Sequence, residues 1–526
     1  MSEGIAVSEE IVAPCEANAA TWLGFILMCL GMFMAILDIQ VVATSLPAIQ
    51  QALKISRDAM SWIQTAYLIA EIIAIPLTGW LTRVLTLRWL FVGSISLFTL
   101  ASIGCAFSFD FATLIGFRVL QGFAGGTLIP AVFSAVFLLF PLRQHPIATT
   151  MAGIMAVLAP TVGPVVGGWI TETWSWHWLF LINVAPGLIA AAATPFLLPA
   201  EKPNFTDLAT LDRTSLALMA ISLASLEIGL KQAPQDGWLS PLCLTLFLAS
   251  AVTATLFAVR TLGARHPVVE LTTLRTRAFA IGCGLSFCLG VGLFGSVYLM
   301  PVFLAYVRHH DAFEIGTIML VTGVAQLVTA PIAGHLESRL DARMLSAAGF
   351  ALFAVGLGAS ALQSRVADFD EMFWPQVLRG IAIMFCLLPP TRLALGTLTS
   401  VQVPDASGLF NLMRNLGGAI GIAAIDTILY GRTRGHADAL RDRLIAGDVT
   451  AAQAIGLDLK LFLHRPPGVS DATVEAYVRP MVEKAAFALS TNEAWALLTI
   501  VALIGLLLVP FAGKMPQAPA VGTGKR

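Results

Sequence analysis

Long apolar segments recur along almost the whole chain and are separated by short polar stretches. A helix needs about 20 apolar residues to cross the hydrocarbon layer of a membrane. Segments of this kind occur at 21–46, 61–80, 89–108, 111–135, 147–171, 178–198, 213–231, 240–260, 279–303, 315–335, 343–362, 376–397, 405–430 and 494–514. A membrane β-barrel would show short alternating segments instead. The pattern therefore predicts an all-α polytopic membrane protein with fourteen transmembrane helices, of which the third and fourth form a tight hairpin around Asp110.

The composition excludes several other classes of protein. Hydrophobic residues make up 57% of the chain and charged residues 12%, against about 25% charged residues in soluble domains. The formal net charge is -1, so there is no overall basic field to attract nucleic acid. The seven cysteines are scattered and form no CxxC pair, which indicates buried apolar residues and neither a disulfide framework nor a metal site.

The distribution of Lys and Arg between the loops predicts the orientation in the membrane. If the N-terminus lies inside, the inner loops hold about three times as many Lys and Arg residues as the short outer loops. We therefore expect cytoplasmic tails at 1–20 and 515–526. The first twenty residues contain four Glu and no Lys or Arg, which is atypical of a cleavable signal peptide.

One long polar segment, 431–493, is expected to be an extracytoplasmic loop. It contains helix-forming stretches at 437–445 and 472–489, separated by a Pro-Pro-Gly break at 466–468. A solvated cap and a docking surface for a partner protein are both compatible with this composition.

An internal repeat relates two halves of the chain. Residues at the ends of the second and tenth segments and just beyond them match at a constant offset of 255, namely Pro76, Gly79, Leu81, Leu85, Arg88 and Leu90 with Pro331, Gly334, Leu336, Leu340, Arg343 and Leu345. The run 119–122 matches 377–380 at an offset of 258. The repeat predicts two six-helix bundles, 21–198 and 279–514, with two inserted helices at 213–260. Parallel repeats of this kind are typical of the major facilitator fold, which binds its substrate between the bundles.

Three ionisable residues fall inside the first four segments, where an uncompensated charge is costly. The rise of about 1.5 Å per residue places Asp38, Glu71 and Arg118 within about one helical turn of the same depth. A carboxyl group whose distance to an arginine changes during transport can take up a proton on one side and release it on the other. We therefore predict that these three residues couple transport to protons. A static ion pair that fixes helix register is the alternative.

Other polar and aromatic side chains in the segments are candidates for a substrate cavity. Arg414 lies near the midplane of its segment, and Asn411 and Asn415 are near it on the helix. Amide and aromatic side chains suit amphipathic organic molecules. The predicted substrate-binding residues are Gln40, Gln64, Phe294, Tyr298, Gln326, Asn411, Arg414 and Asn415. In contrast, we expect Arg379 to reach the membrane surface and Glu227 to pair with Lys231 at a helix end.

Five motifs occur in a characteristic order along the chain. They lie at 37–47 (LDIQVVATSLP), at 79–88 between the second and third segments, at 118–122 (RVLQG), at 159–168 (APTVGPVVGG) and at 176–184 (WHWLFLINV). Together they resemble the fourteen-span drug:proton antiporters of the major facilitator superfamily, the EmrB/QacA-like group. The resemblance implies an antiporter motif formed by Pro160, Gly163, Pro164, Gly167 and Gly168, and a loop motif that includes Gly79, Arg83 and Arg88.

The loop motif departs from the family pattern. The family usually has an acidic residue where this chain has Arg83, and a Gly-Arg-Arg/Lys run where it has Thr86-Leu87-Arg88. The departure puts in question the charge clasp by which the family holds its outward-facing state.

The resemblance implies a transporter of the cytoplasmic membrane that exports drugs or other amphipathic compounds in exchange for protons. No Walker A sequence, HExxH or GxSxG is present, so we expect no ATP, no metal, no cofactor and no enzymatic activity. A proton-coupled transporter of one metabolite, such as a siderophore or amino acid, is the main alternative, and a membrane-embedded transferase is a more distant one. A periplasmic adaptor and an outer-membrane channel are further candidate partners, whereas nucleic acid is not expected.

Overall fold

A computed structural model describes residues 17–204, 211–264, 267–337, 339–463 and 472–512 of the 526-residue chain. Within these ranges the regular secondary structure is helical throughout. The first half contains α1 (Ala19–Leu53), α2 (Arg57–Ala106), α3 (Phe111–Leu139), α4 (His145–Thr173), α5 (Trp178–Leu181) and α6 (Val184–Leu197). The tail 515–526, most of the tail 1–20 and the break at 466–468 lie outside the described residues.

The remaining helices complete the inserted pair and the second half. They are α7 (Arg213–Asp236), α8 (Pro241–Leu262), η2 (Leu271–Arg275), α9 (Arg277–Phe303), η3 (Leu304–Arg308), α10 (Ala312–Glu337), α11 (Ala342–Ser360), α12 (Phe369–Leu395), α13 (Val403–Ile445), α14 (Val449–Ile455), α15 (Leu459–Leu463), α16 (Ala472–Leu508) and η4 (Val509–Phe511). In the described part, 13 helices are long and apolar enough to cross a membrane. The helix α2 contains both the second and the third predicted segments, so the expectation of an all-α, fourteen-span protein is confirmed.

The helix α2 bends where its two segments meet. Thr86 has φ 70° and ψ 159°, a conformation that residues other than glycine rarely adopt. This is the position at which the loop motif usually has glycine. The predicted hairpin that follows is confirmed, because α2 and α3 pack along each other and the Asp110 side chain caps α3 by accepting a hydrogen bond from the Thr113 amide at 2.9 Å.

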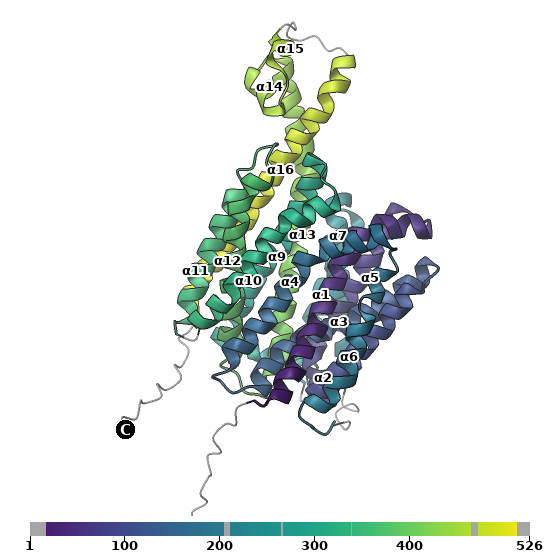
Figure 1. Ribbon diagram of the computed structural model, residues 1–526, viewed down its shortest axis with the longest axis vertical. Helices are drawn as coiled ribbons and strands as arrows, with labels where there is room; N and C mark the ends of the chain where they lie inside the picture. Colours follow the sequence, from purple (N-terminus) through teal and green to yellow (C-terminus); the bar gives the residue numbers. More distant parts are fainter. Residues whose placement is uncertain (1–16, 205–210, 265–266, 338, 464–471, 513–526) are drawn as a thin grey trace, which may run out of the picture.

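Two helical bundles lie side by side (Figure 1). Helices α1 to α6 pack around apolar cores that include Phe91 and Phe133, and α9 to α13 with α16 pack around a core that includes Phe353 and Trp495. The bundles meet where α4 packs on α10 and where α2 and α3 pack on α13.

The inserted helices differ in burial. In the most apolar stretch of α7, 39% of the residues are buried, because α7 packs on both α2 and α13. In the corresponding stretch of α8 only 11% are buried, and the main neighbour of α8 is α7. The inserted pair therefore joins the two bundles through α7 and leaves α8 to face lipid.

The internal repeat is visible in how equivalent glycines pack. A Cβ atom on Gly122 of α3 would collide with the carbonyl of Tyr67 on α2, and one on Gly380 of α12 would collide with the carbonyl of Thr322 on α10. Gly380 is 258 residues after Gly122, and Thr322 is 255 residues after Tyr67. The same close approach of two helices is therefore built twice, once in each bundle.

The segment 431–493 is more helical and more continuous with the membrane helices than the sequence indicates. Helix α13 runs without interruption from Val403 to Ile445, and α16 begins at Ala472. Their ends project beyond the other helices and carry α14 and α15 (Figure 1). A small apolar cluster that includes Leu440, Ile455 and Val482 holds this projection together.

Candidate proton and substrate sites

The buried pair Asp38–Arg118 is the centre of a polar network in the first bundle. Both side chains have 0% exposure, and the Arg118 Nη1 lies 2.5 Å from the Asp38 Oδ2. The other carboxylate oxygen, Oδ1, accepts hydrogen bonds from the Gln121 and Asn183 amides, each at 2.9 Å. The Arg118 Nε donates to the Ile63 carbonyl at 3.1 Å. The Asp38 carboxylate therefore has its charge balanced inside the protein, without contact to water.

Four helical segments hold this network in place. Asn183 reaches Asp38 because the helical run is interrupted between α5 and α6, at 182–183. The Arg118 guanidinium also lies over the ring of Tyr67, 4.3 Å from its centre. Arg118 and Gln121 are three residues apart on α3 and so face the same neighbour. Any sliding of α1 relative to α3 would change the distance between Asp38 and Arg118.

Glu71 is near this network in depth but is not part of it. Its side chain is 5% exposed and makes no hydrogen bond or ion pair within the described part of the chain. Arg118, Arg414 and Glu227 all act on it electrostatically. The three residues that the sequence places at one depth therefore separate into a tight ion pair and a lone carboxyl group.

The lone carboxyl group faces the inserted helix α7. Lys231 of α7 donates to the hydroxyls of Ser61 and Thr65 on α2, at 2.9 and 2.6 Å. One turn along α7, Glu227 lies near the depth of Glu71 and repels it electrostatically. Lys231 thus binds α2 instead of forming the expected close pair with Glu227, and α7 contributes a second acid near Glu71.

The predicted substrate-binding residues of α9 contact α13, whereas Arg414 and Asn411 of α13 bind each other and lie near α3. The Arg414 Nη2 donates to the Asn411 Oδ1 at 2.5 Å, and the Arg414 guanidinium lies 5.6 Å from the ring centre of Phe133. The Tyr298 hydroxyl donates to the Asp426 carboxylate at 2.6 Å. A Cβ atom on Gly418 would meet the Phe294 ring. Asn415 and Gln64 are half-buried.

A pocket between the bundles gathers only part of the predicted set. It lies between α4, α9, α10 and α12 and contains the predicted residues Gln326 and Pro160. It also contains Arg379, which is 3% exposed and stacks on Trp495 at 4.6 Å. The expectation that Arg379 reaches the membrane surface is wrong, because the helix packing encloses its side chain next to Gly356 and Trp495.

The antiporter motif lies on α4 and gives that helix close neighbours on both sides. A Cβ atom on Gly163 would collide with Gln40 of α1. Ser45 donates to the Gly167 carbonyl at 3.4 Å and lies 2.6 Å from the Thr171 hydroxyl. Pro160 and Pro164 remove backbone donors within the helix, and Gly168 is buried. The motif thus fixes one face of α4 against α1, and another face of α4 lines the pocket.

The loop motif forms an ion pair of reversed polarity between the bundles. The Arg83 guanidinium pairs with the carboxylate of Asp405, which is buried at the start of α13, and also donates to the Pro267 carbonyl at 3.1 Å. Gly79 permits this approach, since a Cβ atom there would collide with Asp405. Arg88 lies over the Trp89 ring at 5.2 Å. A basic residue in place of the usual acid therefore still connects the two bundles.

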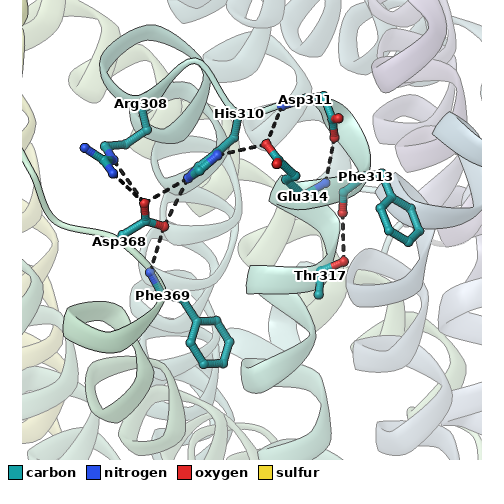
Figure 2. Close-up of polar contacts among 8 residues, drawn as sticks. All are labelled: Arg308, His310, Asp311, Phe313, Glu314, Thr317, Asp368 and Phe369. Atoms are coloured by element: carbon teal, nitrogen blue, oxygen red, sulfur yellow. Dashed lines mark hydrogen bonds and ion pairs between the residues drawn. The ribbon is translucent and has the colours of Figure 1, made fainter.

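A second ionic network connects the N-terminal ends of α10 and α12 (Figure 2). The Asp368 carboxylate accepts hydrogen bonds from Arg308 at 2.6 Å and from the His310 Nε2 at 3.0 Å. The His310 Nδ1 lies 2.9 Å from the Glu314 carboxylate. Although partial burial opposes it, hydrogen bonding to Asp368 and Glu314 raises the pKa of His310 above its ordinary value.

Comparison with known proteins places the chain in a family. Residues 28–422 match the family model described as Major Facilitator Superfamily. The chain belongs to this superfamily. A "Colistin resistance protein EmrB" of Acinetobacter baumannii is 38% identical over 79% of this chain and 81% of its own length. The "Multidrug export protein EmrB" of Escherichia coli K12 is 30% identical over 95% and 96%. The "Fatty acid resistance protein FarB" of Neisseria gonorrhoeae is 26% identical over 96% and 98%.

Membership of the Major Facilitator Superfamily makes the chain a transporter, as the sequence resemblance implies. Major facilitator transporters are built from two related helical halves and bind their cargo between them. Sequence reasoning assigned no role to Asn183 or Asp405, although Asn183 is part of the fifth motif. A buried amide or acid at a helix end is the signal that could have identified both.

Proposed function

We propose that this protein exports amphipathic organic compounds across the cytoplasmic membrane in exchange for protons. The observation that carries the proposal is the Asp38–Arg118 pair, a fully buried carboxylate held by one arginine and two amides. A carboxylate in such a site changes its proton affinity strongly when its arginine moves away. Similarity to two proteins named for multidrug export and colistin resistance supports drug-like cargo.

The proposed exchange of cargo for protons depends on the Asp38–Arg118 pair, whose two residues lie on different helices of the first bundle. The proposed cycle starts with the Asp38 carboxylate charged and paired with Arg118. When the bundles rock, α1 shifts relative to α3, the pair separates, and the carboxyl group takes up a proton from the outer side. Return of Arg118 expels the proton to the cytoplasm. Glu71, which lacks a close partner, would respond to the same movement or to a cationic cargo.

The proposal includes a location and a set of partners. We place both termini in the cytoplasm, because the inner loops carry more Lys and Arg. The projection formed by α13, α14, α15 and α16 would then lie outside, where an adaptor protein and an outer-membrane channel could bind it. The proton gradient drives transport, without ATP or another cofactor.

The test uses purified protein in sealed vesicles loaded with a fluorescent drug. We expect a pH difference across the membrane to drive movement of the drug against its concentration gradient, and an uncoupler to stop this movement. Protein-free vesicles are the control. Equal rates with and without the pH difference and membrane voltage would refute proton coupling.

A further inference from the structure

We propose that the pocket around Arg379 binds the anionic group of an amphipathic organic acid. This proposal rests on the proposed function and specifies a class of cargo for it. The pocket is lined by α4 of the first bundle and by α9, α10 and α12 of the second. It is therefore located between the two moving parts.

The first argument is that Arg379 carries a buried charge without a counter-ion. Its side chain forms no ion pair within the described part of the chain, and its Nε has no hydrogen-bond partner there. Its Nη2 has only the weak acceptor Met300 Sδ, at 3.5 Å. An arginine stays protonated, and an isolated buried charge costs several kcal/mol. Stacking on the Trp495 ring offsets only part of that cost.

The second argument is that no acidic side chain lines the pocket to neutralise Arg379, so a ligand is left to do so. Helix α9, which begins the second bundle as α1 begins the first, contains no Asp or Glu between Arg277 and Phe303. The polar neighbours of Arg379 in the pocket are uncharged: Thr161, Ser296, Thr322 and Gln326. The Gln326 Oε1 in the pocket also lacks a hydrogen-bond partner within the described residues, but it carries no negative charge that could neutralise Arg379. The unbalanced positive charge of Arg379 favours an anion.

The third argument is that the rest of the wall is apolar and adaptable. Val157, Pro160, Leu293, Val297, Met300, Met319 and Ile383 complete the lining. Methionine side chains adjust to ligands of different shape. The guanidinium fits a carboxylate or another planar anionic group, and the apolar side chains around it fit the start of an attached hydrocarbon. The cavity is small in this state, so the body of the cargo would extend beyond it between the bundles.

Binding can be tested directly on the full-length protein in detergent, without a gradient. The probes are dodecanoate, dodecyltrimethylammonium and dodecanol, which share the same alkyl chain and differ in charge. At about pH 8 the carboxylic acid is ionised. Titration calorimetry should show dodecanoate binding at least about tenfold more tightly than dodecyltrimethylammonium, and Arg379→Met should remove that preference. Arg379→Lys should retain part of it, because the charge remains without the planar fork.

The matched control is Arg275→Met, which removes an exposed arginine outside the pocket. It should leave all three affinities within about twofold of the unchanged protein. If the unchanged protein binds the carboxylate and the ammonium equally, the proposal is wrong, even if Arg379→Met does not fold. An equal loss of all three probes in Arg379→Met also overturns it. Gradient-driven export of the ammonium probe from vesicles tests the proposed function separately, so failure of one experiment is distinguishable from failure of the other.

Discussion

The two bundles each bury an arginine within one turn of the equivalent repeat position, but only the first supplies its counter-ion. Arg118 pairs with Asp38, whereas Arg379 has no acid beside it in the described part of the chain. Gln121, which donates to Asp38, is 258 residues before Arg379. The duplicated helix packing has thus been kept while the charges on it have changed.

The acidic residues of the two bundles differ in the same way as the arginines and their partners. Glu71 on α2 is 255 residues before Gln326 on α10, so an acid in the first bundle corresponds to a neutral amide in the second. A bundle that contains both charges can exchange a proton internally, because one partner can neutralise the other. A buried arginine without an acid beside it, such as Arg379, must obtain its negative partner from a ligand. The difference suggests a division of labour, with protons handled by the first half and cargo anions by the second.

The strongest test of this division is Asp38→Asn. The substitution keeps the size of the side chain and removes the only group of the network that can bind and release a proton at physiological pH. We expect gradient-driven export to fall to the level of protein-free vesicles. Exchange of labelled cargo across vesicles at equal pH should continue, and this exchange is the control for folding. Breaking a buried ion pair costs about 3–5 kcal/mol, so the melting temperature should also fall. Gradient-driven export at the normal rate would remove Asp38 from the coupling mechanism.

The second test is Gln326→Glu, which gives the second bundle an acid at the position equivalent to Glu71. The new carboxylate is placed in the pocket that contains Arg379 and can supply the missing counter-ion. We expect the melting temperature to rise and the affinity for dodecanoate to fall by about tenfold or more, since cargo and side chain now compete. Gln326→Met is the matched control, which has a similar volume and no charge. Unchanged affinity for dodecanoate in Gln326→Glu would show that the two halves do not differ in this way.

The sequence indicates the helices and the repeat well because both depend on local patterns. Apolar runs of membrane length and glycines at a fixed offset are visible without any knowledge of packing. For the same reason Asp38 and Arg118, which are charges inside apolar runs, are identified from the sequence alone.

The details of the sites depend on packing between distant segments, which the sequence does not show. Arg379 looks like a residue near a helix end, and only the neighbouring Trp495 and Gly356 reveal that it is enclosed. Asp405 can be recognised as an acid at a helix start, but its partner cannot, because Arg83 is more than three hundred residues away in the chain. The position of a charged residue in its own segment predicts its depth in the membrane. It does not predict which side chain of a neighbouring helix will lie against it.

The third test concerns the ion pair that joins the two bundles. Arg83→Asp and Asp405→Arg should each place like charges together at the contact of α2 with α13, and the double variant should restore attraction. Coupled neighbours typically show interaction energies of about 0.5–3 kcal/mol. The measurement is the alkylation rate of a cysteine introduced by Ser407→Cys, a buried position where α13 contacts α3. Faster alkylation in each single variant and recovery in the double variant are expected. If the double variant reacts as fast as the single ones, the pair does not hold the bundles together.

The smallest effect is expected where the two halves differ at the N-terminal ends of α3 and α12. Asp110 and Asp368 are 258 residues apart and cap α3 and α12, but only Asp368 also binds an arginine and a histidine. Because the pKa of His310 is raised by folding, its protonated form stabilises the protein. This contribution is complete below the ordinary pKa of histidine and is lost as the pH rises through the raised value.

Replacing His310 by Gln should therefore lower the melting temperature at acidic pH and have little effect at alkaline pH. The site is partly exposed, so the loss should correspond to less than about 1 kcal/mol. The neighbouring His309→Asn is the matched control, since His309 is exposed and has a left-handed conformation that asparagine tolerates. Arg308, Asp311, Glu314 and Asp368 are unchanged in both variants, so only the histidine charge differs. An equal loss of stability at acidic and alkaline pH would assign His310 a packing role. The N-terminal ends of α3 and α12 would then differ in contacts but not in their response to protons.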